Sequence, residues 1–104
     1  MARYLIEVPH EANLVACTHA VQVFLKTGSH FLTHADFGCA DGDHKAWLTV
    51  DVDSREEARR ILPPPLRARA RVVKLIKFSL THYGALLQDH LQEAAGREAA
   101  RAAA

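Results

Sequence analysis

The stretch SHFLTHADFGCADGDHKAWLTVDV, residues 29–52, decides the fold. Residues 30–39 alternate polar with apolar side chains, and residues 44–52 are rich in β-branched and aromatic ones, which is typical of two strands. Between them, Asp41-Gly42 is a strong short-range signal for a hairpin turn. We therefore expect a hairpin of the second and third strands, in which Cys39 faces His44 and Asp36 faces Trp47.

The chain on either side of this hairpin shows further strand and helix patterns. Period-two alternation predicts strands, apolar residues at helical spacing predict helices, and Ser54 with Glu57 forms a capping box. These patterns place strands at residues 2–8 and 70–78, and helices at residues 11–26 and 54–62. A last helix, capped by Ser79 or Thr81, precedes an Ala-rich tail that we expect to fray.

This order of elements defines the fold class. A βαββαβ order predicts an α+β, ferredoxin-like domain over residues 1–78, with a four-stranded antiparallel sheet in the order 4-1-3-2 and both helices on one face. Residues 79–104 add the C-terminal helix and tail. The other sheet face would be open. Since a domain of this size buries a modest share of its surface, we expect a second copy to cover that face and form a homodimer.

Charge and composition exclude several function classes. The 104 residues carry a formal net charge of +1, which gives no strong drive toward nucleic acid or an anionic membrane. The N-terminus resembles neither a signal peptide nor a membrane span, so we expect a cytoplasmic protein. A basic stretch at residues 55–77 raises the alternative of RNA binding, but the third strand lacks the aromatic pattern of an RNA-recognition domain.

The two faces of the predicted hairpin differ in chemistry. One face carries mainly apolar residues and is the expected core face. The open face carries His30, Leu32, His34 and Asp36 from the second strand and Lys45, Trp47, Thr49 and Asp51 from the third. Two histidines, two carboxylates and an indole suit a half-enclosed pocket better than an ordinary solvated surface.

Two groups of side chains are candidate metal ligands. We expect strands one and three to run in parallel, which would gather Glu7, His10, His30 and Asp51 at one sheet edge as a histidine-carboxylate site. At the other end, Cys39 and His44 form either part of a soft-metal site or a thiolate-imidazole pair. The alternative for both groups is structural: exposed histidines and a small buried cysteine. Cys17 lies on the apolar stripe of the first helix and is expected in the core.

A third group suggests acid-base chemistry. His34 and Asp36 lie two residues apart on one predicted strand and share a face. A histidine beside an acid can move a proton without a cofactor. The alternative is a set of polar contacts across a dimer interface.

Residues 1–78 as a whole resemble the dimeric α/β-barrel branch of ferredoxin-like proteins, in which two sheets face each other around a shared cavity. The stretch SHFLTHADFGCADGDHKAW resembles a family of short, uncharacterised bacterial proteins within that branch. The branch includes muconolactone-isomerase-like enzymes, haem or quinone-type monooxygenases and small nickel-binding proteins, so the resemblance implies a fold and leaves several activities open.

These observations lead to one main prediction, a small homodimeric protein that binds a transition metal: nickel, zinc, copper or iron. Its candidate ligands are His10, His30, His34, Asp51, Cys39 and His44. The main alternative is a cofactor-independent isomerase or monooxygenase-like enzyme with His34 and Asp36 in proton transfer and a small-molecule ligand in the barrel. A third interpretation is an interaction module without a ligand.

Overall fold

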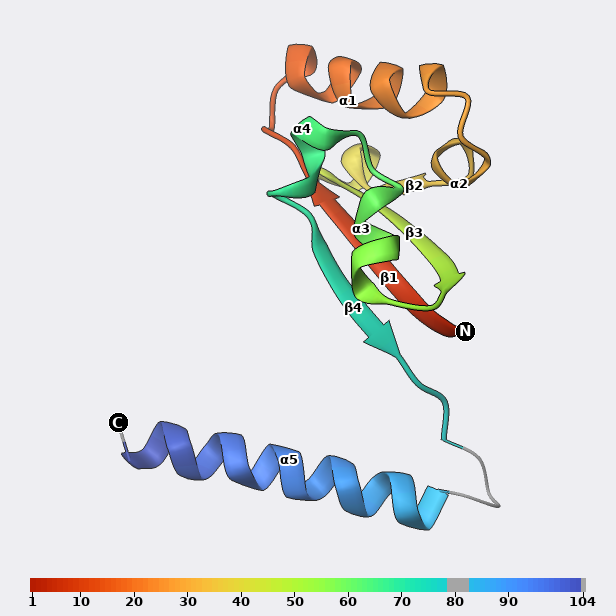
Figure 1. Ribbon diagram of the computed structural model, residues 1–104. Coiled ribbons are helices and arrows are strands. Elements are labelled where there is room, and N and C mark those ends of the chain that lie inside the picture. Colours follow the sequence, from red (N-terminus) through yellow and green to blue (C-terminus); the bar gives the residue numbers. More distant parts are fainter. Residues whose placement is uncertain (79–82, 104) are drawn as a thin grey trace.

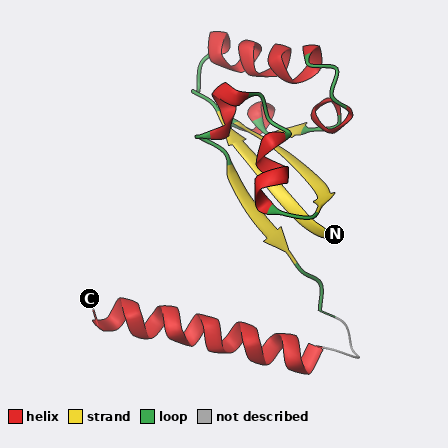
Figure 2. Ribbon diagram, in the orientation of Figure 1, coloured by secondary structure: helices red, strands yellow, loops and turns green. Residues whose placement is uncertain are grey.

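The computed structural model describes residues 1–78 and 83–103 as an α+β protein built on one antiparallel sheet (Figures 1 and 2). The sheet order is β2-β3-β1-β4, which is 4-1-3-2 when counted from the opposite edge. The strands are β1 (Ala2–Pro9), β2 (Asp36–Phe37), β3 (Lys45–Val52) and β4 (Arg71–Leu75). The predicted caps Ser79 and Thr81 lie outside the described residues.

Five helices and one 3₁₀ turn complete the described part of the chain. The helices are α1 (Leu14–Lys26), α2 (His30–Thr33), α3 (Arg55–Arg60), α4 (Pro64–Arg67) and α5 (Tyr83–Ala103), and the 3₁₀ turn is η1 (Cys39–Asp41). Figure 1 shows α3 lying across the sheet and α5 lying apart from it. Among these residues, no helix combines the length and the apolar character needed to cross a membrane.

The core lies between the sheet and α3. Alternate residues of the two central strands are buried: Tyr4, Ile6 and Val8 from β1, and Ala46, Leu48 and Val50 from β3. The burial of the three β3 residues confirms the predicted core face of that strand. Ala58 and Leu62 pack against them from α3 and the turn after it, and Phe24 does so from α1. Burial of these apolar side chains is the main source of stability, at roughly 25 cal/mol per Å² removed from water.

The predicted second strand over residues 30–39 is wrong except at Asp36–Phe37. Gly28, with φ of 73°, turns the chain, and the following residues form the short helix α2, in which the Thr33 hydroxyl donates to the His30 carbonyl at 3.1 Å. This helix puts Leu32 in the core with 1% exposure and leaves Phe31 41% exposed. Leu32 was predicted on the open face and therefore lies on the opposite side from that expected. Alternation over so few residues could not distinguish a strand from one helical turn.

The hairpin register is confirmed, but its turn is longer than predicted. Asp36 pairs with Trp47 as expected, and the Gly38 amide donates to the Lys45 carbonyl at 3.0 Å. Beyond this bond the chain forms η1, and Gly42 adopts φ of 83°, a left-handed conformation that favours glycine. Cys39 and His44 therefore belong to the loop, and neither lies in a strand.

The prediction that strands one and three run in parallel is wrong. They are antiparallel, with Ala2 opposite Val52 and Pro9 opposite Lys45. The end of β1 therefore meets the start of β3, as a sheet with hydrogen-bonded antiparallel neighbours requires. This separates the predicted group at one edge: His10 lies at the loop end of the hairpin, whereas Asp51 lies opposite Arg3 at the other end.

The segment after β3 begins as predicted. The Ser54 hydroxyl accepts from the Glu57 amide at 3.1 Å, which confirms the predicted cap. The Glu57 carboxylate reaches back one residue further than a capping box requires and accepts from the Asp53 amide at 3.2 Å. Three arginines of the basic stretch then donate to backbone carbonyls of this region: Arg55, Arg59 and Arg67. The guanidinium groups of these three arginines therefore bind the protein's own backbone.

Candidate metal centre

Four side chains with metal-binding atoms meet at the loop end of the hairpin. They are His10, Cys17, Cys39 and His44, and one ligand atom from each lies within 4.8 Å of all the others. All four residues are half-buried. Four different segments supply them: the end of β1, the first turn of α1, η1, and the loop before β3.

Antiparallel pairing of β1 with β3 brings the two histidines together. The pairing of Pro9 with Lys45 continues one residue further, where the His10 amide donates to the His44 carbonyl at 3.1 Å. The imidazole rings meet edge to face, with centroids 5.5 Å apart and an interplanar angle of 86°. The backbone pairing thus places the two histidines side by side.

The two cysteines arrive from a helix cap and a tight loop. Asn13 begins α1, since its side chain accepts from the Ala16 amide at 2.8 Å. This places Cys17 one turn into the helix, with its amide bonded to the Asn13 carbonyl. Cys39 opens η1, and its sulfur lies 3.2 Å from Nε2 of His10. Both cysteines are free thiols.

Burial shifts the pKa of two side chains in this cluster, His10 and Cys39. It lowers the pKa of His10, with smaller contributions from the nearby charges of His44 and Arg69. It also raises the pKa of the Cys39 thiol, and Cys17 adds to that effect. This direction does not favour a reactive thiolate-imidazole pair of Cys39 and His44, and that alternative stays a prediction.

Each histidine of the cluster also has an unsatisfied polar atom. Nδ1 of His10 and Nδ1 of His44 are both buried without a hydrogen-bond partner among the described residues. Buried polar atoms are nearly always paired, and leaving one unpaired costs about 1–3 kcal/mol. Two such atoms in one cluster indicate a site that is incomplete without a further ligand.

The chemistry of the four donors is specific. Two thiols and two imidazoles make a Cys₂His₂ set, which is the tetrahedral ligand set of structural zinc sites. Sulfur and nitrogen donors in this combination favour zinc over the hard cations magnesium and calcium. The residues are therefore suited to hold one transition-metal ion.

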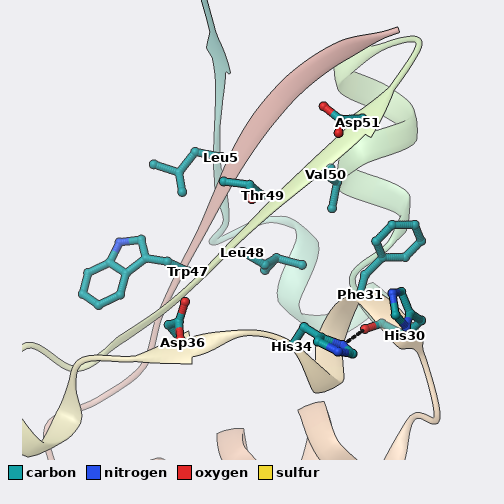
Figure 3. Close-up of a pocket in the computed structure, with 10 residues that line it drawn as sticks. All are labelled: Leu5, His30, Phe31, His34, Asp36, Trp47, Leu48, Thr49, Val50 and Asp51. Carbon is teal, nitrogen blue, oxygen red and sulfur yellow. Dashed lines mark hydrogen bonds between the residues drawn. The ribbon is translucent and has the colours of Figure 1, made fainter.

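The other predicted site residues lie elsewhere, around a hollow of about 430 Å³ between α2 and β3 (Figure 3). The hollow is lined in part by His30, His34, Asp36 and Asp51. The rings of His30 and His34 are close, with centroids 4.4 Å apart. Asp51 instead accepts from Arg3 at 3.1 and 3.3 Å, which lowers the pKa of that carboxyl.

His34 and Asp36 were predicted to share a face of one strand, but His34 caps α2 and Asp36 begins β2, and no hydrogen bond joins them in the described residues. Nδ1 of His34 lies 2.8 Å from the His30 carbonyl, and Figure 3 shows the imidazole pointing away from Asp36. Because Nδ1 of His34 is hydrogen-bonded to a backbone carbonyl, the Asp36 carboxylate does not orient this ring. The proton-transfer alternative thus loses its expected geometry, although the hollow itself is present.

Sequence reasoning missed Cys17 as a ligand. Its place on the helical stripe with Val21 and Phe24 indicated the core, and Phe24 is indeed fully buried. The available signal was position: Cys17 is seven residues after His10 and lies in the first turn of the helix that follows strand one. That turn stays near the strand end, where the cluster forms.

Comparisons with protein-family models, curated proteins and solved structures give no match to this chain.

Proposed function

We propose that this protein binds one zinc-class transition-metal ion through His10, Cys17, Cys39 and His44. The observation that carries the proposal is the convergence of four ligand atoms within 4.8 Å from four separate segments. Four protein ligands would close a tetrahedral site, which is typical of a structural rather than a catalytic metal. The ion would supply cross-linking of these segments.

The proposed ion has a clear place in the stability of the fold. Helix α1 is held to the core mainly through Ala20 and Phe24, while Leu14 and Val15 at its start are 82% and 80% exposed. A metal bound to Cys17 would fasten this loosely packed end to the sheet. Because free energy of metal binding adds to that of folding, loading and stability of α1 would be coupled.

The test is metal content of the full-length chain purified without chelator and then loaded with Zn²⁺. We expect one zinc per chain by elemental mass spectrometry, lost in Cys17→Ser and in His44→Gln. His19→Gln is the matched control, because His19 is an exposed histidine of α1 outside the cluster. Zinc retained by both cluster variants would contradict the proposal.

We further propose a homodimer of ferredoxin-like domains, in keeping with the resemblance to dimeric α/β barrels. On the sheet face opposite the core, Leu5 and Val73 pair with each other and are half-buried, and Trp47 lies on the same face. A second copy on this face would cover these side chains. Sedimentation equilibrium should give twice the chain mass, and Val73→Glu should shift it to one chain; a monomeric wild-type protein would contradict this.

The proposed compartment is the reducing cytoplasm. Cys17 and Cys39 are free thiols in the structure, and only the reduced form supplies two thiolate ligands.

A further inference from the structure

We propose that His30 and His34 form a second, exchangeable metal site, whose free coordination positions face the hollow between α2 and β3. Part of the wall of this hollow, Leu5 and Trp47, belongs to the sheet face that a second copy would cover. It would take a divalent transition metal that accepts nitrogen and oxygen ligands. Small anions or water would complete its coordination. This inference is independent of the Cys₂His₂ site, with which it shares no residue.

The backbone presents the two imidazoles as a pair. His30 begins α2 and His34 caps its end, so they lie four residues apart on one helical turn. Their ring centroids are 4.4 Å apart, and both residues are exposed. Two histidines at this spacing on one helix face are a recurring chelate for transition metals.

One hydrogen bond sets the ligand atom of His34. Its Nδ1 lies 2.8 Å from the His30 carbonyl oxygen (Figure 3), and since a carbonyl only accepts, Nδ1–H is the donor. In the neutral imidazole this places the proton on Nδ1 and leaves the lone pair on Nε2. Metal-bound histidines almost always have this arrangement, in which the second nitrogen donates to a carbonyl or carboxylate.

The hollow beside the pair suits a small ligand. It measures about 430 Å³ and is lined by aromatic walls, Phe31 and Trp47, as well as by Asp36. The Trp47 indole is held in place, since its N–H donates to the Glu7 carboxylate at 3.0 Å. Two imidazoles fill only two coordination positions of a metal, so an oxygen-donor anion could occupy the others within this space.

Charge around the hollow favours a cation. Asp51 is neutralised by its ion pair with Arg3. Asp36 takes part in none of the ion pairs found in the described residues, so its carboxylate is not neutralised by a lysine or arginine. We therefore expect Asp36 to strengthen metal binding without being one of the two fixed ligands.

The test uses the zinc-loaded full-length protein and Ni²⁺ as the probe, because nickel accepts imidazole ligands and does not oxidise thiols. Equilibrium dialysis followed by elemental analysis counts both metals in one sample. We expect one nickel in addition to one zinc per chain. His30→Gln and His34→Gln should each weaken nickel binding at least tenfold with zinc unchanged, Asp36→Asn should weaken it several-fold, and His19→Gln should have no effect.

A second measurement locates the nickel without relying on the variants. Paramagnetic Ni²⁺ should broaden the nuclear magnetic resonance signals of residues 29–37 first. Three outcomes would overturn the second site. They are the absence of bound nickel, nickel binding by both histidine variants as tight as that of the wild-type protein, and broadening centred on other residues. If the wild-type protein bound nickel but no zinc, the result would contradict the Cys₂His₂ proposal and support this one.

Discussion

The sulfur of Cys39 lies 3.2 Å from Nε2 of His10, although 29 residues separate them in the chain. The contact exists because β1 and β3 are antiparallel, so the end of one strand meets the loop that precedes the other. Cys17 and His44 complete the group. A metal at this point would connect segments that are distant in sequence, so its four ligands come together only in the folded chain.

Zinc should therefore stabilise the fold. At a free concentration 1,000 times the dissociation constant, binding to the native state alone adds about 4 kcal/mol to the free energy of unfolding. We expect the thermal midpoint of the wild-type protein to rise when zinc is added and to fall again with excess chelator. Cys17→Ser should unfold at the same temperature with and without zinc. A zinc-dependent rise of equal size in this variant would show that the ion binds elsewhere.

Stability of the metal-free protein should depend on pH through His10 and Cys39. The folded pKa of His10 lies below its ordinary value of 6.5, so the unfolded chain takes up the proton first and stability falls as pH drops from about 6.5 toward the folded pKa. The folded pKa of Cys39 lies above 9.0, so its contribution is present below pH 9 and is lost as pH rises through the folded value.

Chemical denaturation across this range checks both limbs. The free energy of unfolding should be highest between about pH 6.5 and 9. His10→Gln should flatten the acid limb, while the exposed His19→Gln should leave it unchanged. An acid limb of full slope in His10→Gln would mean that another group causes it.

The sequence predicted those parts of the fold that rest on long repeated patterns. Period-two alternation identified β1, the content of β-branched and aromatic residues identified β3, and the capping box located α3. Residues 30–35 were misassigned, because six residues hold too little periodicity to distinguish a strand from one turn of helix. Tertiary burial of Leu32 decided that segment, and this information is not local.

The site was predicted in pieces. His10, Cys39 and His44 were candidate ligands, but the assumed parallel pairing of strands one and three grouped His10 with His30 and Asp51. The relative direction of two strands depends on the whole sheet. The wrong direction for strands one and three therefore placed the residues at the strand ends beside the wrong neighbours. Cys17 could not be distinguished from a core residue, because both uses place a small side chain on the inner face of α1.

The arginines of the basic stretch should contribute to stability through the backbone. Arg59 donates from one nitrogen to the carbonyls of Arg67 and Ala70, at 2.7 and 2.9 Å. Its removal leaves both half-buried carbonyls without this charged donor. We expect Arg59→Ala to lower the free energy of unfolding by about 2 kcal/mol.

Arg60 offers the matched control in the same helix. Its side chain is exposed and makes no hydrogen bond within the described residues, so Arg60→Ala should change stability by less than about 0.5 kcal/mol. Urea denaturation measures both variants. Equal losses would mean that the net charge of the stretch, rather than these bonds, determines stability.

Gly38 should be required for the loop that carries Cys39. A Cβ at this position would lie 2.7 Å from the Asp43 carbonyl oxygen and 2.7 Å from the Trp47 ring. This carbonyl belongs to the backbone of the loop and accepts a hydrogen bond from the Lys45 amide at 2.8 Å. It therefore cannot move easily to make room for a Cβ. We expect Gly38→Ala to cost about 1–3 kcal/mol by overpacking.

Gly42 separates this packing effect from backbone strain in the same loop. A Cβ at Gly42 would meet nothing within 4 Å, but its φ is 83°. Gly42→Ala should therefore cost only about 1–2 kcal/mol of left-handed strain, and Gly42→Asn less, because asparagine tolerates this conformation. Gly38→Asn should be worse than Gly38→Ala, since a larger side chain meets the same two neighbours.

Metal affinity tells whether the loop also positions its ligand. Gly38→Ala displaces the residue next to Cys39, so we expect zinc affinity to fall at least tenfold, whereas Gly42→Asn should keep it. Competition with a chromophoric chelator measures both. If Gly38→Ala lost stability yet bound zinc as tightly as the wild-type protein, the close packing of Trp47 on Gly38 would serve the sheet alone, and the four ligands would hold their geometry without it.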